Sequence, residues 1–185
     1  MNSKVLVGLF LAFLMVSSIA GFVIDQASFT NQGKVKYLGR SFAQTDQGYL
    51  TYLGNDQILI SSDPRNVQLY QGLESLSLEE LNSAGKIYFT FNPSDNLQNT
   101  LSYFNAAIVP RFNKNMIISC KADSPECADL PIITCADATE SIKIIQLDLA
   151  DSPSLTYNNN CLLIQGNQAT LPNLFDSLIL DLLLL

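Results

Sequence analysis

Histidine and tryptophan are absent from this chain of 185 residues. Without histidine, the chain lacks the usual general base of catalysis and cannot build a Ser-His-Asp arrangement. It also lacks the commonest metal ligand of proteins. We therefore predict a protein without catalytic activity, and the sequence assigns no catalytic residue and no cofactor.

Basic residues are scarce as well. The chain has 10 Lys and Arg residues against 17 Asp and Glu residues, which gives a formal net charge of −7. An acidic chain repels phosphate groups, so nucleic acids and anionic lipid surfaces are poor partners. The sequence also contains no G-x-G-x-x-G motif and no Walker loop, which excludes the standard nucleotide-binding classes.

The N-terminus carries the longest uncharged run of the sequence. Lys4 precedes residues 5–24, which hold no charged side chain, and Ser18-Ile19-Ala20 fits a small-x-small cleavage site. The same run is long enough to span a membrane as a helix. We expect residues 1–25 to be either a cleaved signal peptide or an N-terminal membrane anchor. Both place the rest of the chain outside the cytoplasm, secreted or anchored, and contact with a membrane is expected only through residues 5–24 if they are not cleaved.

The remaining chain is interpreted as one extracytoplasmic domain. Residues 26–33 are polar and predict a linker, and residues 34–185 predict the domain itself. Its first part, residues 34–72, has short strand-like runs separated by turns such as Gly54-Asn55, which predicts an antiparallel β portion. Residues 73–185 predict an α/β part.

The segment from Lys86 to Cys120 is expected to organise the fold. It has the pattern of a strand over residues 86–91, a helix from an Asn92 cap to Pro110, and a second strand that ends at Cys120. A strand, a crossover helix and another apolar strand predict a parallel pair. The predicted fold class is α/β with a mixed sheet, and α+β is the alternative.

Two further helices and two further strands follow from local signals. Ser77 predicts the start of a short helix that ends at Gly85 in the left-handed conformation. Residues 142–149 and 161–166 predict strands, and the polar residues 151–160 between them predict a turn region. Thr170 is expected to cap a C-terminal helix, which should pack on the sheet because its apolar residues recur at helical spacing: Leu171, Leu174, Phe175, Leu178, Ile179, Leu182 and Leu183.

Four cysteines stand at positions 120, 127, 135 and 161. An even number in an oxidising compartment predicts two disulfides. Pairing Cys120 with Cys127 would close an acidic loop, and pairing Cys135 with Cys161 would tie the last strands together, although two other pairings exist on paper. Zinc is disfavoured, because the C-x₂₋₄-C spacing of zinc ribbons is absent.

Two weaker site hypotheses come from oxygen-bearing side chains. Asp123, Glu126 and Asp129 could supply the hard oxygen ligands that calcium prefers, and the alternative is an acidic surface exposed to solvent. In a parallel sheet, ligands favour the carboxyl ends of the strands. A polar or sugar-like ligand could bind there, unless the side chains concerned simply cap helices: Asn92, Ser94, Asp95, Asn167 and Gln168.

The segment Asn160–Gly166, followed by a leucine-rich helix, is similar to C-terminal segments of uncharacterised archaeal cell-surface proteins. The resemblance covers about thirty residues. It implies a location in the cell envelope and brings no catalytic residue with it.

The leading functional interpretation is a cell-surface structural or interaction module, with other envelope proteins as partners. A secreted ligand-binding domain is the alternative, and an enzyme is the least expected. A structural module should show a flat apolar patch or an exposed sheet edge, whereas a binding domain should show a deep polar crevice.

Overall fold

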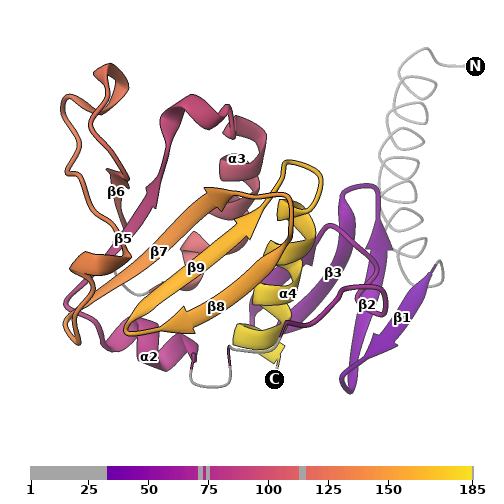
Figure 1. The fold of residues 1–185 in the computed structure, drawn as a ribbon. Coiled ribbons are helices and arrows are strands. Elements are labelled where there is room, and N and C mark those ends of the chain that lie inside the picture. The colour runs from indigo at the N-terminus through magenta and orange to yellow at the C-terminus, as the bar shows by residue number, and fades with distance from the viewer. Residues whose placement is uncertain (1–32, 71–72, 74–75, 113–115, 185) are drawn as a thin grey trace, which may run out of the picture.

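The computed structural model describes residues 33–184, except residues 71–72, 74–75 and 113–115. The predicted leader, residues 1–25, lies outside the described residues, as does nearly all of the predicted linker. The described chain forms two sheets (Figure 1). One has four strands in the order β1-β2-β3-β4, and the other has five in the order β6-β5-β7-β9-β8.

The small sheet is an antiparallel meander, as the sequence predicts for this part. Gly54 adopts φ +62° in the predicted turn between its last two strands. Alternation along the strands gives the sheet one buried face, which includes Phe42, Ile58 and Ile60. The strands are β1 (Lys34–Tyr37), β2 (Arg40–Thr45), β3 (Gly48–Leu53) and β4 (Asp56–Ile60).

The large sheet is mixed, which confirms the predicted fold class. Four neighbouring strands, β6, β5, β7 and β9, run parallel, and β8 pairs with β9 in the antiparallel direction. The predicted parallel pair of the strand-helix-strand segment is therefore present as β5 and β6. The strands are β5 (Lys86–Phe91), β6 (Met116–Cys120), β7 (Ile142–Leu149), β8 (Ser154–Asn158) and β9 (Cys161–Gly166).

Helices α3 and α4 lie against one face of the large sheet (Figure 1). The ring of Phe104 on α3 stacks on Phe89 of β5 at 4.5 Å between centroids, and Phe175 of α4 lies 5.1 Å from Phe104. The helices are α2 (Leu78–Ser83), α3 (Gln98–Ala107) and α4 (Leu171–Leu184), with 3₁₀ turns η1 (Pro93–Asp95), η2 (Val109–Arg111), η3 (Pro125–Cys127) and η4 (Cys135–Asp137).

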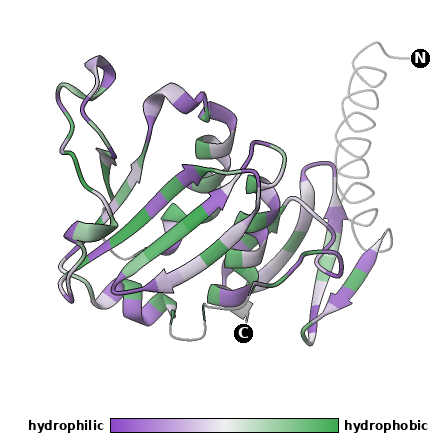
Figure 2. Cartoon of the chain, in the orientation of Figure 1, coloured by the Kyte–Doolittle hydropathy of each residue, from purple (hydrophilic) through white to green (hydrophobic). Residues whose placement is uncertain are grey.

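The C-terminal helix packs on the sheet as predicted. Figure 2 shows hydrophobic residues concentrated in α4 and in the central strands β7 and β9. Gly166 at the end of β9 allows this close packing, because a Cβ there would lie 2.8 Å from Cδ1 of Leu174. Within the described ranges, no helix has both the length and the apolar character needed to cross a membrane. The fully buried residues of α4 are Leu171, Leu174, Phe175, Asp176, Ser177, Leu178 and Leu180.

The predicted helix from Asn92 to Pro110 is wrong in its first part. The Asn92 side chain accepts a bond from the Ser94 N–H at 3.3 Å, but it caps the short turn η1. Asn96 then adopts φ +51°, which an α-helix cannot contain, and α3 begins at Gln98. Asparagine tolerates this left-handed conformation better than most residues, so the local chemistry of Asn96 overrides the helical pattern.

Two other boundaries differ from the predictions. The polar residues 151–160 include the strand β8, because pairing with β9 supplies its backbone bonds despite the weak strand signal. Gly85 is not in the left-handed conformation, and Ala84, with φ −59°, is the C-cap of α2. The Gly85 N–H instead donates to the carbonyl of Ser141 at 2.8 Å, which ties the end of α2 to the start of β7.

Candidate functional site

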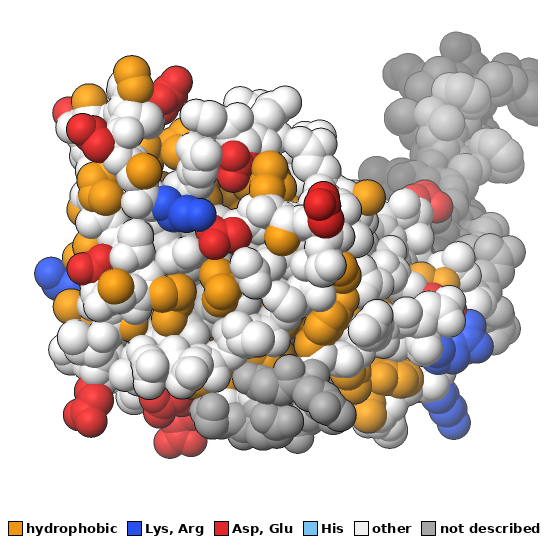
Figure 3. Space-filling model, in the orientation of Figure 1, with side chains coloured by type: hydrophobic (Ala, Val, Ile, Leu, Met, Phe, Trp, Pro, Cys, Tyr) orange, Lys and Arg blue, Asp and Glu red, His pale blue; other side chains and the backbone are white. Residues whose placement is uncertain are grey.

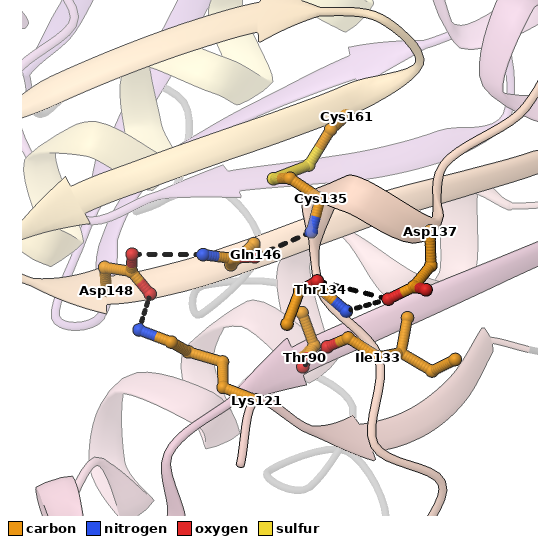
Figure 4. Close-up of a disulfide and its surroundings, with 9 residues drawn as sticks. All are labelled: Thr90, Lys121, Ile133, Thr134, Cys135, Asp137, Gln146, Asp148 and Cys161. Atoms are coloured by element: carbon orange, nitrogen blue, oxygen red, sulfur yellow. Dashed lines mark hydrogen bonds and ion pairs between the residues drawn. A yellow bond between two sulfur atoms is a disulfide. The ribbon is translucent and has the colours of Figure 1, made fainter.

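The face of the large sheet opposite α3 and α4 is partly covered by the connection between β6 and β7. The Thr90 hydroxyl donates to the carbonyl of Ile133 at 2.7 Å, and the Cys135 N–H donates to Gln146 Oε1 at 2.9 Å (Figure 4). On the same face, the Lys121 ammonium pairs with Asp148 at 2.6 Å. The polar groups drawn in Figure 4 are thus engaged with one another.

Two disulfides hold this connection in place. They join Cys120 to Cys127 and Cys135 to Cys161, as predicted. The first closes the loop that follows β6, and the second fastens η4 to β9. Because disulfides persist in oxidising compartments, both bonds are consistent with an extracytoplasmic location.

The structure gives no set of ligands for the predicted calcium ion. Asp123, Glu126 and Asp129 are all exposed. Among the residues that the structure describes, no group of three or more His, Cys, Asp or Glu side chains could hold a metal ion. Their exposure agrees with the alternative of an acidic surface, and calcium binding by these three residues stays a prediction.

The residues proposed for a polar ligand make local bonds. Asn92 donates to Asp95 at 2.9 Å and accepts from the N–H of Ser94. Asn167 accepts from the N–H groups of Ala169 and Thr170 at 3.0 and 3.1 Å in the turn before α4, and its own N–H donates to the Thr170 hydroxyl at 2.9 Å. Gln168 reaches the carbonyl of Asn96 at 3.4 Å, which brings the two segments together. Ligand binding by these residues stays a prediction.

Lys143 is a buried cation, and only 3% of its side chain is exposed. Its ammonium donates to Asn160 Oδ1 at 2.6 Å and also to the carboxylate of Glu80. Burial lowers the pKa of Lys143, but the bond to Glu80 raises it, and the net effect is a pKa above the ordinary value. Lys143 therefore stays charged and ties α2 to the sheet, which does not suit a nucleophile.

Two of the four sheet edges carry side chains that resist pairing with another strand. Edge strand β1 exposes Lys34 and Lys36, and edge strand β8 exposes Thr156 and Asn158. Charged side chains on an edge strand oppose further strand pairing, and the exposed polar side chains of β8 offer a partner strand no apolar surface to bury.

The edge of β4 is closed by side chains of the helices. The fully buried Asp176 of α4 accepts bonds from the N–H groups of Ser61 and Ser62 at 3.0 and 2.8 Å, and from the Ser61 hydroxyl at 2.7 Å. The Tyr103 hydroxyl also donates to Asp176. Burial and the neighbouring charge of Asp176 raise the pKa of Tyr103, so this hydroxyl keeps its proton. Four donors thus surround one carboxylate at the end of β4.

Farther along β4, the guanidinium of Arg111 donates to the carbonyl of Gln57. Between these two closures lies a crevice of about 510 Å³. It is bounded by the small sheet and by α3: Thr45, Asp46, Gln47, Leu50, Gln57, Leu59, Tyr103, Ala106, Ala107 and Arg111.

The edge of β6 is different. The N–H of Lys121 donates to Phe91 of β5, whereas the N–H of Cys120 points the other way and donates to Pro131. Because backbone groups alternate along a strand, Met116 and Ile118 point theirs away from β5, as Cys120 does. Within the described residues, no other strand pairs with β6 on this side. We call the outward backbone groups of Met116 and Ile118 the β6 edge.

An apolar groove lies beside this edge, between β6 and α3. Its volume is about 390 Å³, and none of its lining residues is charged. Ile118 at its rim is 44% exposed, as is Ile132, which bridges to Cys120. Figure 3 shows hydrophobic side chains distributed over this face of the molecule, including its left border, the side on which Figure 1 places β6. The β6 groove is lined by Phe89, Phe91, Leu101, Ser102, Phe104, Asn105, Val109, Met116 and Ile118.

The sequence analysis predicted β6 as a strand but did not identify its edge as a site. The available signal is the run MIIS at residues 116–119, four uncharged residues that contain no proline. This run differs from β1, where lysines alternate with apolar residues. No protein-family model, no curated protein and no solved structure matches this chain.

Proposed function

We propose that this chain is an extracytoplasmic interaction module of the cell surface, without catalytic activity, that binds a protein surface at the β6 edge and the β6 groove. One observation carries the proposal. Three sheet edges are protected by lysines, polar side chains or helix side chains, whereas the β6 edge is uncharged and lies beside an apolar groove.

Edge strands are templates for strand pairing, and proteins normally protect them. An added strand gains main-chain hydrogen bonds from the edge and specificity from pockets that take its alternate side chains. The β6 edge offers the backbone groups of Met116 and Ile118, and the groove offers an apolar pocket. The envelope location implied by the archaeal resemblance and the two disulfides agrees with envelope proteins as partners.

The absence of catalysis is part of the proposal. The chain has no histidine. Its buried ionisable groups are committed to structural bonds, since Asp176 is surrounded by four donors and Lys143 is held by Glu80 and Asn160. A carboxylate or amine in such a position is not available to a substrate.

Site-specific photo-cross-linking in intact cells tests the proposal. A benzoylphenylalanine residue replaces Ile118 in the full chain, and a matched variant carries it at Thr156 on the β8 edge. We expect a covalent adduct of defined mass from position 118 and at most a tenth of that yield from position 156. Equal yields, or no adduct at position 118, would reject the proposed function.

A second candidate is the binding of a small polar ligand, and the crevice beside β4 is the observation that favours it. Tyr103 and Arg111 stand at its margins, and Ala106 and Ala107 form an apolar wall. A panel of mono- and disaccharides, titrated into isotope-labelled protein, should shift the NMR signals of Ala106 and Ala107 in the wild type. Ala107→Trp, which fills the crevice, should remove the shifts. If no sugar shifts these signals, this candidate is excluded.

A further inference from the structure

We infer that the partner at the β6 edge is a second copy of this chain, paired antiparallel through β6 about a two-fold axis at Ile117. This inference rests on the proposed function and names its partner. The length of the β6 edge, the sequence of β6 and the placement of the acidic loop support it.

The β6 edge is short. At Cys120 the outward N–H is taken by Pro131, and the carbonyl accepts from the N–H of Ile133. Outward groups remain at Met116 and Ile118, which is too little backbone to hold a flexible peptide that loses its conformational entropy on binding. A folded partner avoids that loss and brings further surface. A second copy supplies the same edge and groove twice.

The sequence of β6 suits pairing with the β6 strand of a second copy that runs in the antiparallel direction. A two-fold axis at Ile117 places Met116 opposite Ile118 of the second copy, and Ile118 opposite its Met116. Each of these pairs exchanges two hydrogen bonds, because the backbone groups of both residues point outward. Ile117 lies opposite itself between the two pairs. The pairs formed by Met116, Ile117 and Ile118 are then all aliphatic, with side chains on both faces of the extended sheet.

Charge favours the same arrangement. The residues that line the β6 groove carry no charge, so two copies do not bring like charges together there. The acidic loop with Asp123, Glu126 and Asp129 follows the carboxyl end of β6. Antiparallel pairing puts the two acidic loops at opposite ends of the interface and so limits their repulsion. A parallel pairing would place them side by side.

Ile117→Cys tests the inference in the full chain, in its own oxidising compartment. Residues opposite each other in a non-hydrogen-bonded antiparallel pair have Cα atoms about 4.5 Å apart, within the range that a disulfide spans. We expect most of the Ile117→Cys chain to run as a dimer on a non-reducing gel and as a monomer after reduction. The matched control, Thr156→Cys on the β8 edge, should stay monomeric.

A second variant separates specific pairing from chance oxidation. Ile118→Lys, added to Ile117→Cys, places a charge beside the axis and should lower the dimer yield at least tenfold. Peptide mapping of each variant should still find Cys120 joined to Cys127 and Cys135 joined to Cys161. A monomeric Ile117→Cys chain with these native disulfides intact would overturn the inference.

The unmodified protein gives an independent measurement. Sedimentation of the wild-type full chain in a mild detergent should show a concentration-dependent mass of two chains, and Ile118→Lys should shift it to one. If photo-adducts form at position 118 with a different protein while the wild type sediments as a monomer, the second copy is rejected and the proposed function stands. If position 118 gives no adduct, the proposed function fails as well.

Discussion

Helix α3 lies between two edge strands, β4 and β6. Side chains close the edge of β4, whereas the edge of β6 is open. Toward β4, Tyr103 and its partner Asp176 close the edge with hydrogen bonds, and Arg111 covers the carbonyl of Gln57. Toward β6, α3 presents Leu101, Ser102 and Asn105 to an open apolar groove. Side chains of α3, α4 and η2 therefore close the first edge, whereas the second edge stays available.

The comparison shows that a sheet edge does not need a strand to be closed. Side chains from α3 and α4 satisfy the backbone groups at the end of β4, and this closure also joins the small sheet to the large one. An unsatisfied buried backbone group costs about 1 to 3 kcal/mol, so the closure stabilises the contact between the sheets. Toward β6, the polar side chains Ser102 and Asn105 of α3 line the groove, and the Ser102 hydroxyl donates to the carbonyl of Gln98 in its own helix.

The largest expected effect comes from Leu178→Asp in α4, the helix that supplies Asp176. Leu178 is fully buried, and an unpaired carboxylate there costs an amount comparable to the whole stability of a domain. Circular dichroism should show no cooperative unfolding transition. The control Leu149→Asp, at a side chain 43% exposed, should change stability by about 0.5 kcal/mol or less. A wild-type melting temperature for Leu178→Asp would mean that α4 does not support the two sheets.

The two disulfides hold the segment that follows β6, and removing each of them measures its contribution to the free energy of unfolding. The loop-entropy relation gives about 3.5 kcal/mol for the bond between Cys135 and Cys161, which are 26 residues apart. It gives about 2.5 kcal/mol for Cys120 and Cys127, which are 7 residues apart. Urea unfolding of the two double serine variants measures both losses. A larger loss for the shorter loop would contradict this order.

Asp176→Ala reopens the edge of β4. It leaves the N–H group of Ser62 and the Tyr103 hydroxyl without their acceptor, while the N–H of Ser61 keeps only the Tyr103 oxygen at 3.1 Å. We expect a loss of about 3 kcal/mol in the free energy of unfolding. Tyr103→Phe removes one donor and keeps the carboxylate bonded, so its loss should be about 1 kcal/mol. Cross-linking from position 118 should be unchanged by Tyr103→Phe. Equal losses for the two variants would show that Asp176 is not the centre of the closure.

The smallest effect concerns the turn after β4. The bond from Arg65 lowers the pKa of Asp63 from 3.8 to about 2. A depressed folded-state pKa contributes stability above the ordinary value of 3.8, and this contribution is lost as pH falls through about 2. Carboxyl NMR titration should give a midpoint near 2 for the wild type and a clearly higher one for Arg65→Gln. Identical midpoints would show that Arg65 does not hold Asp63. Arg65→Gln should not affect the β6 edge.

Local patterns in the sequence predicted much of the fold. Apolar alternation indicated β7, helical spacing indicated α4, and the even number of cysteines predicted the two disulfides. These features depend on residues that are near in sequence or on a simple pairing rule. The start of α3 was missed because one residue, Asn96, adopts a conformation that apolar spacing does not report.

The candidate site could not be predicted in the same way. Ser61 and Asp176 are 115 residues apart, and nothing local in either segment indicates the other. The position of β6 at the sheet edge follows from the strand order, which depends on where β7 and β9 pair. Polar β8 became a strand because β9 offers it a partner. Which strand lies at an edge, and which side chains close that edge, is determined only when the sheets assemble.

The disulfide pattern also has a consequence for biosynthesis. A chain that crosses a membrane N-terminus first delivers its cysteines in the order 120, 127, 135 and 161. The native bonds join the first to the second and the third to the fourth. Pairing by order of arrival therefore yields the correct connectivity, and no wrong bond has to be broken before Cys135 meets Cys161 as β9 emerges. We therefore expect an exported chain to form both native bonds without a disulfide isomerase.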